Sequence, residues 1–198
     1  MLTGRGQKIS SSYFQLRTGG DIMAMQGICK AVIAADDEAQ RAGQARILDV
    51  DFIAEHTHGF EAFVEFVRNL SWSEIEHYTA LTREQIEHAA SIYMKAERVI
   101  ACWGMGITQH KHASDAMHQI LNLLFLRGNI GRLGTGACPI RGHSNVQGDR
   151  TVGINKTPTE VFLSQMDKAF GFRSPREHGH DTAECCEAIL RGEVDAFM

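Results

Sequence analysis

The sequence predicts an α/β domain with a mostly parallel sheet, helices on both faces and an extra helical portion at about 50–96. Two short apolar segments, 13–16 and 99–103, are each followed by a turn that contains glycine and then by an apolar helical stretch. A third apolar segment, 194–198, follows a helical pattern. Because parallel strands need a helical crossover between them, this order favours a three-layer, Rossmann-like arrangement.

The first elements lie close to the start of the chain. Residues 1–12 are polar and rich in Gly and Ser, so we expect a loop or the cut end of a linker there, and we assign 13–198 to the α/β domain. The first helix is predicted over about 22–35, followed by a polar connection at 36–44. The last predicted strand runs to the final residue, and we therefore expect the domain to be truncated at its C-terminus.

The helical portion shows amphipathic spacing and two helix starts. Apolar residues within 60–67 recur at i, i+3, i+4 and i+7, which places them on one helical face. Ser71 with Glu74, and Thr82 with Gln85, match the capping box, in which the two side chains satisfy free N–H groups at a helix start. These patterns predict a layer of short helices.

The second strand–turn–helix unit consists of the strand 99–103, a glycine turn and a helix over about 112–127. The stretch 128–153 is rich in glycine and has no hydrophobic period, so we expect a long loop there. Two more helices are predicted, at 158–170 and at 181–191 with Asp181 as N-cap.

The composition argues against several classes of protein. The net charge is −4 and no basic run is present, which excludes a general nucleic-acid or anionic-membrane surface. The longest apolar stretch, 120–126, is far shorter than the ~20 residues of a membrane span. The five cysteines contain no C-x-x-C motif, and the polar first residues do not form a signal peptide, so we expect a cytoplasmic protein.

Two turns are candidates for nucleotide binding. The glycines of Gly104–Gln109 allow the backbone to approach a phosphate, although Gln109 stands where the dinucleotide fingerprint requires a third glycine. In Arg17–Asp21, the side chain of Asp21 is either an N-cap, which is the commoner role, or a carboxylate that accepts N–H groups of a guanine edge. If both turns follow neighbouring parallel strands, they face one crevice at the carboxyl edge of the sheet.

A third candidate segment spans 134–150. Polar side chains alternate there with small or apolar residues, and Lys and Glu are absent. The segment is either a solvated loop or a binding loop for a polar ligand.

The histidine and cysteine pairs are interpreted as structural. The three His-x-His pairs have no further ligand at a familiar spacing, so no metal site is predicted. The neighbouring Cys185 and Cys186 are interpreted as a helix packing pair.

Together and in this order, these segments resemble the molybdopterin-dependent oxidoreductases of the dimethyl sulfoxide reductase superfamily, on the branch of the formate dehydrogenase-like alpha subunits. The similarity lies in five pieces: Gln15–Ile22, similar to L-R-x-G-x-D; Asp51–Glu61, similar to D-F-I-x-x-H-T-x-G-F-E; Gly104–His110, similar to G-M-G-x-T-Q; Gly128–Arg132, similar to G-N-I-G-R/K; and Pro139–Gly148, similar to P-x-R-G-x-x-N-V-Q-G.

The resemblance implies an enzyme that holds molybdenum or tungsten between two molybdopterin guanine dinucleotides. It implies that Met105 and Gln109 lie near the pterin or its phosphates, and that Gly19, Gly20 and Asp21 lie near the guanosine. The other cofactor-binding positions carried over are Arg17, Gly104, Gly106, Gly142, Asn145 and Gln147.

The resemblance also implies catalytic residues. Arg141 would anchor a small anionic substrate, because a guanidinium pairs with a carboxylate through two hydrogen bonds and keeps its charge. His143 is a second candidate. The pair His143-Ser144 departs from the pattern common in formate dehydrogenases, so the substrate stays open, as does the electron-transfer partner.

In the family, the 4Fe–4S cysteines and the metal-ligating residue lie upstream of this region, and a barrel domain lies downstream. We therefore expect a fragment that is inactive alone and belongs to a two-electron oxidoreductase when full length. One alternative is a freestanding Rossmann-like nucleotide-binding module without catalytic activity. The central domain of a thiamine-diphosphate enzyme is the least favoured interpretation.

Overall fold

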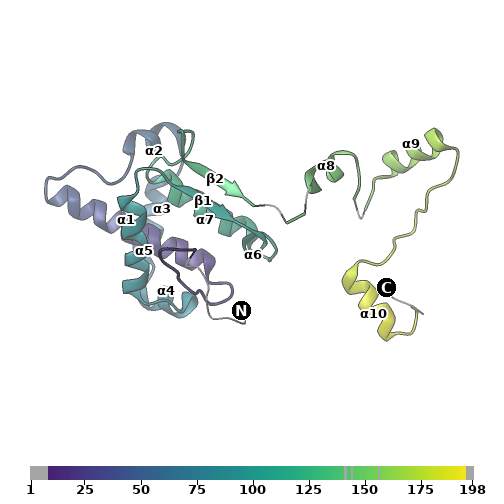
Figure 1. The fold of residues 1–198 in the computed structure, drawn as a ribbon, viewed down its shortest axis with the longest axis horizontal. Coiled ribbons are helices and arrows are strands. Elements are labelled where there is room, and N and C mark those ends of the chain that lie inside the picture. The colour runs from purple at the N-terminus through teal and green to yellow at the C-terminus, as the bar shows by residue number, and fades with distance from the viewer. Residues whose placement is uncertain (1–8, 141, 144, 156, 195–198) are drawn as a thin grey trace. The chain divides into compact units, whose positions relative to one another are not determined.

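The computed structural model describes residues 9–140, 142–143, 145–155 and 157–194 (Figure 1). The chain divides into two compact units, unit 1 at residues 1–142 and unit 2 at residues 143–198. Within the described ranges, no helix is long and apolar enough to cross a membrane.

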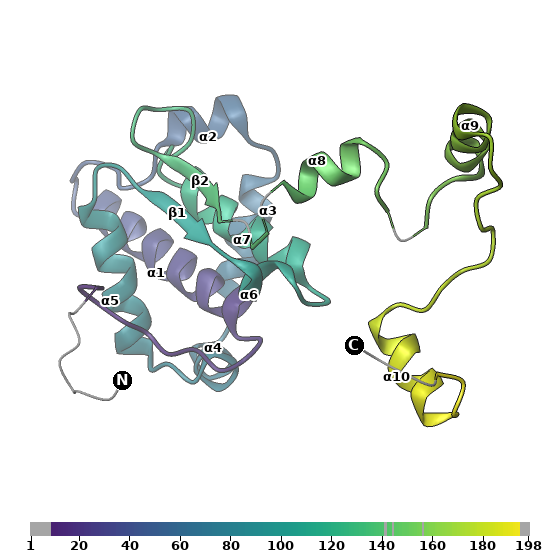
Figure 2. The same cartoon turned by 45° about the vertical axis from the view of Figure 1, so that its right-hand side comes forward.

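Unit 1 places most of its helices around one central helix. Its elements are α1 (Asp21–Arg41), α2 (Val50–His56), α3 (Phe60–Asn69), α4 (Trp72–Thr79), α5 (Arg83–Lys95), β1 (Ile100–Trp103), α6 (Met105–Thr108), α7 (Ala113–Phe125) and β2 (Gly136–Pro139). Helices α3, α4, α5 and α7 all pack against α1 (Figure 2). Buried Val32 and Ile33 of α1 share the main hydrophobic core with Val67 of α3 and Leu123 of α7.

The helices at 50–95 follow the predicted pattern. The Ser71 side chain accepts from the N–H of Glu74, while the Glu74 carboxylate accepts from the N–H of Ser71; Thr82 and Gln85 make the same pair of bonds before α5. Both predicted capping boxes are therefore confirmed.

Strands β1 and β2 form a two-stranded parallel sheet, and α6 and α7 connect them. The register pairs Ile100 with Gly136 and Cys102 with Cys138. This small sheet is compatible with an α/β fold, but the described residues do not show the three-layer, Rossmann-like arrangement. Ile100 is 54% exposed, so one face of β1 lacks the burial that its apolar sequence predicts.

Residues 13–16 do not form the predicted strand. They have no strand partner in the described part of the chain, and Phe14 and Leu16 pack instead against the second hydrophobic cluster, which consists of Ile75, Leu81 and Ile86. A short segment with alternating apolar side chains can bury them on helices as well as in a sheet, and here the helices α4 and α5 are the surface.

Helix α1 continues to Arg41, through much of the predicted polar connection. The reason is Asp36, which is 1% exposed. Its carboxylate accepts from Arg46 Nη2 at 2.7 Å and from the N–H groups of Ile47 and Leu48 at 2.7 and 3.1 Å. These bonds hold residues 46–48 against α1. They also satisfy the Asp36 carboxylate, so this charged residue can be buried.

Unit 2 contains α8 (Val146–Thr151), α9 (Glu160–Phe170) and α10 (Thr182–Leu190) in its described residues. Asp181 caps α10 as predicted, by accepting from the N–H groups of Ala183 and Glu184. Helix α9 begins two residues later than predicted, because Thr159 and not Pro158 precedes its first turn as N-cap.

The predicted loop over 128–153 contains two ordered elements, the strand β2 and the whole of α8, the first helix of unit 2. Gly136 has a φ of 137°, and β2 ends at Pro139, so neither residue is typical of a strand. Pairing with β1, far away in the sequence, orders this segment. Of the predicted last strand, residues 195–198 lie outside the described residues.

Candidate functional site

Two of the candidate segments leave the sheet side by side. Gly104 and α6 follow β1, while Ile140 and Gly142 follow β2, its parallel neighbour. The N–H of Ile140 donates to the carbonyl of Trp103 at 2.7 Å, which extends the pairing beyond β2. We call this region the strand-end site; it comprises Gly104, Met105, Gly106, Gln109, Ile140 and Gly142.

Met105 and Gly142 bring the two segments into contact. A Cβ placed on Gly142 would lie 2.6 Å from the Met105 sulfur, so only glycine fits beneath this thioether without a shift. The Met105 side chain is 45% exposed and therefore available to a further group. Both residues are cofactor-binding candidates from the sequence, and the structure places them together.

The glycines of the first segment border open space. A Cβ on Gly104 or Gly106 would meet no other atom within 4 Å. Gly104 has extended backbone, with φ of −118° and ψ of −155°, and the N–H of Gln109 donates to the carbonyl of Met105 at 2.9 Å to close a single helical turn. The packing of the chain itself does not require glycine at these two positions.

The Arg17–Asp21 turn is held on the C-terminal end of α4. The N–H of Arg17 donates to the Thr79 carbonyl at 2.8 Å, and its guanidinium donates to the His77 carbonyl at 2.7 Å. A Cβ on Gly20 would lie 2.8 Å from the Tyr78 carbonyl oxygen, so this glycine is required by a close approach of two backbones. Gly20 therefore has a structural role in this turn, in addition to the cofactor role that the sequence predicts for it.

Asp21 is the first residue of α1, and Gly20 occupies the N-cap position, so the predicted N-cap role of Asp21 is wrong. In the part of the chain that the structure describes, its carboxylate has no hydrogen-bond or ion-pair partner. Figures 1 and 2 both place the start of α1 at the same end of unit 1 as α6. Since 13–16 is not a strand, however, the turn does not follow a neighbouring strand of the sheet.

The remaining candidates lie outside unit 1 or outside the described residues. Arg141 is not among the described residues. In unit 2, exposed His143 precedes Asn145, which has a φ of 60° and is the N-cap residue of α8. Gly148 leaves room for the Asn145 side chain, and exposed Gln147 accepts from Thr151 through its carbonyl at 2.9 Å.

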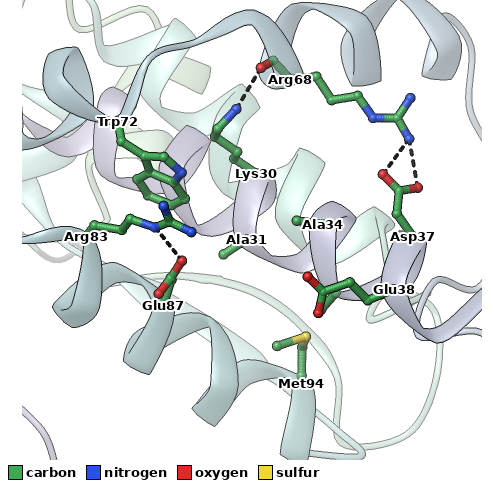
Figure 3. Close-up of a pocket in the computed structure, with 11 residues that line it drawn as sticks. Lys30, Ala31, Ala34, Asp37, Glu38, Arg68, Trp72, Arg83, Glu87 and Met94 are labelled. Atoms are coloured by element: carbon green, nitrogen blue, oxygen red, sulfur yellow. Dashed lines mark hydrogen bonds and ion pairs between the residues drawn. The ribbon is translucent and has the colours of Figure 1, made fainter. Parts of the chain in front are cut away.

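A groove of about 440 Å³ in the helical portion contains none of the predicted site residues (Figure 3). Most of its charged groups have partners: Lys30 donates to the backbone carbonyl of Arg68 at 2.6 Å, and the Arg68 guanidinium pairs with Asp37 at 2.8 Å. Arg83 pairs with Glu87 at 2.7 Å. Burial, and then the nearby Arg83 charge, lower the pKa of Lys30. Because these partners engage all the charged groups of the groove except Glu38, its described residues show no converging set of free polar groups.

The described residues contain no group of three or more His, Cys, Asp and Glu side chains that could hold a metal ion.

Comparison with known proteins gives relatives but no family model: none matches the chain. Protein YdeP of Escherichia coli is 43% identical over 198 residues, which are all of this chain and 26% of the relative. An uncharacterized oxidoreductase of Mycobacterium tuberculosis is 36% identical over 197 residues, again all of this chain and 25% of the relative. A Staphylococcus aureus protein with the name "putative formate dehydrogenase" is 30% identical over 93% of this chain and 19% of the relative.

The chain thus spans about a quarter, or less, of the length of these relatives. The similarity covers the candidate segments together with the helical portion, because it extends over nearly the whole chain. Two of these relatives are named as oxidoreductases, one of them as a putative formate dehydrogenase.

Proposed function

We propose that this chain is a cofactor-binding part of a molybdopterin-dependent oxidoreductase similar to formate dehydrogenase alpha subunits, and that the strand-end site binds a molybdopterin guanine dinucleotide. The observation that carries the proposal is the contact of Met105 with Gly142, which joins two segments that resemble the family's cofactor loops. The oxidoreductase names of two relatives agree with this class of reaction. When bound, the molybdenum or tungsten of the cofactor would supply two-electron oxidation or reduction of a small substrate.

The residues of the strand-end site fit such a group. The open space beside Gly104 and Gly106 leaves room for a ligand next to the backbone, where N–H groups can donate to phosphate oxygens. The exposed amide of Gln109 adds a donor and an acceptor. Outside this site, Asp21 at the start of α1 has no partner for its carboxylate in the described part of the chain, and it is suited to accept two N–H groups from a guanine edge.

A test of cofactor binding requires the full-length protein, produced in a host that makes the cofactor. We expect molybdenum or tungsten, with guanine nucleotide released on acid treatment. Gly104→Val fills the open space while keeping an extended backbone that valine adopts readily, so it should lose most of the bound metal and nucleotide. Gly179→Val is the matched control, because Gly179 also borders open space but lies outside the site.

Two results would overturn the proposal. One is a full-length protein that contains neither metal nor guanine nucleotide. The other is a protein that binds guanine nucleotide without either metal, which would favour a freestanding nucleotide-binding module.

For Arg141 we propose the role of substrate anchor. Arg141→Lys in the full-length protein keeps the charge but loses the two-pronged geometry, so turnover of an anionic substrate should fall while metal and pterin contents stay unchanged. Loss of cofactor in this variant would indicate a structural role, and unchanged kinetics would remove Arg141 from the site.

A further inference from the structure

Two cysteines face each other across the small sheet. Cys102 on β1 and Cys138 on β2 are register partners, and neighbouring parallel strands lie about 4.8 Å apart. In a parallel pair, register partners project from the same face of the sheet. The two side chains therefore lie next to each other on one face of the small sheet.

Both thiols are open to reagents in solution. Cys102 and Cys138 are exposed, and the neighbouring Ile100 on the same face is 54% exposed. The other cysteine of unit 1, Cys29, is fully buried in the core, and this burial raises the pKa of its thiol to about 12. Reactivity toward an oxidant is therefore expected at the sheet pair and not in the core.

We propose that Cys102 and Cys138 form a redox-active dithiol that closes reversibly to a disulfide. The spacing of about 4.8 Å between adjacent strands falls within the roughly 4.4–6.8 Å between Cα atoms that disulfides require. Sequence reasoning missed the pair because the two cysteines are far apart in the chain and form no C-x-x-C motif.

The oxidant is a peroxide. One thiol loses its proton, and the thiolate attacks one peroxide oxygen and becomes a sulfenic acid. The O–O bond breaks, and the hydroxide that leaves takes up the released proton to form the first water. The second thiol then attacks the sulfenic sulfur, the S–S bond forms and the second water leaves. The two sulfur atoms together lose two electrons, which the peroxide gains. Desolvation and then the adjacent Cys138 raise the pKa of Cys102.

The position of the pair suggests what the bond would do. Trp103 and Pro139 are the last residues of the two strands, and the strand-end site begins directly after them. A disulfide one residue earlier would hold together the strand ends that carry this site. Any effect on cofactor binding rests on the proposed function, whereas the thiol chemistry does not.

The test is peptide mapping of the chain after hydrogen peroxide treatment at low protein concentration, with no cofactor present. We expect the loss of two titratable thiols from this pair, linked peptides that contain Cys102 and Cys138, and recovery of both thiols with dithiothreitol. Cys102→Ser and Cys138→Ser should each abolish the linked peptides. The control is Cys185→Ser combined with Cys186→Ser, which should leave them unchanged, because these cysteines lie in α10 of unit 2.

The proposal is wrong if Cys102 and Cys138 stay reduced while other thiols react, or if each oxidises separately to a sulfinic acid without forming the link. The map of the unaltered chain gives this answer even where a serine variant fails to fold. Since the assay contains no cofactor, its failure leaves the proposed function untouched, and failure of cofactor binding leaves the dithiol untouched.

Discussion

Units 1 and 2 stabilise their helices by different means. In unit 1, α1 buries residues such as Val32 and Ile33 against several other helices. In the described residues of unit 2, only Ser174 and Ala188 are buried, and Val161 of α9 is 68% exposed. Unit 1 is therefore held by a hydrophobic core, whereas the described residues of unit 2 form no such core.

Polar contacts take the place of a core in unit 2. Arg176 pairs with Glu160 at 2.9 Å and with Asp167 at 2.7 Å, and Asp167 also accepts from the Ser174 hydroxyl at 2.6 Å. Asp181 starts α10 through its capping box. Since isolated short helices are marginal in water, local signals of this kind define where a helix begins but add little to its stability.

The largest expected difference between the units is the cost of removing a leucine side chain. Leu124→Ala in α7 should lower the free energy of unfolding by about 3 kcal/mol, because Leu124 is 1% exposed and the change leaves a cavity. Leu190→Ala in α10 should change it by less than about 0.5 kcal/mol, because Leu190 is 87% exposed. Urea unfolding followed by far-UV circular dichroism, which reports the helices of both units, measures both. Equal effects of the two changes would contradict the contrast.

The next effect concerns the buried carboxylate of unit 1. Arg46→Ala removes the charged partner of Asp36 and should cost about 2 kcal/mol in urea unfolding. Arg176→Ala in unit 2 should have a smaller effect on thermal or urea unfolding, because its partner Glu160 is largely exposed. A larger effect of Arg176→Ala would reverse the comparison.

The pH dependence of unit 1 follows from the same carboxylate. Burial by itself raises the pKa of Asp36, but the hydrogen bonds from Arg46, Leu48 and Ile47 outweigh burial, so this pKa lies below its usual value of 3.8. The stabilisation is therefore present above pH 3.8 and is lost as the pH falls through the lowered pKa. Acid titration of the unfolding free energy should show a smaller loss in Arg46→Ala than in the unaltered chain. An unchanged acid loss would mean that another group causes it.

Helix caps should have similar energies but different consequences in the two units. Ser71→Ala should cost about 1 kcal/mol of unfolding free energy while α4 remains helical, because buried Ile75 and Thr79 hold this helix. Asp181→Ala should unfold α10 itself, where Ala188 is the one buried residue of the helix. Amide hydrogen exchange of α4 and α10 measures the difference. Protection of α10 that survives Asp181→Ala would show that this helix has other support.

The smallest effect is local to unit 2. Hydrogen bonds from Arg176 and then Ser174 lower the pKa of Asp167 to about 2. Ser174→Ala removes the hydroxyl donor and should raise this pKa, measured by carboxyl NMR titration, to a value still below the usual 3.8 because Arg176 remains. The control is Ser164→Ala, since the Ser164 hydroxyl donates to Glu160 and should leave the Asp167 titration unchanged.

Features that depend on neighbouring residues in the chain could be predicted from the sequence, whereas features that depend on distant residues could not. The caps at Ser71, Thr82 and Asp181 could be predicted, because each depends on residues within one helical turn. The strand at 100–103 could be predicted too, from its apolar run before a glycine turn. The prediction of a strand at 13–16 was wrong, because its apolar residues pack against helices. The local sequence pattern does not indicate whether such residues contact a sheet or helices.

For the candidate site, the sequence alone determined the residue types and their order: glycines after a strand, an aspartate after a glycine turn, and a polar segment after 134. Only the tertiary structure decided that Met105 rests on Gly142, that Asp21 is not an N-cap and that Cys102 faces Cys138. The physical reason is that helix starts and turns depend on neighbours in the chain. Strand pairing and core packing depend instead on residues that are distant in sequence, and local patterns do not specify which of several apolar surfaces such residues contact.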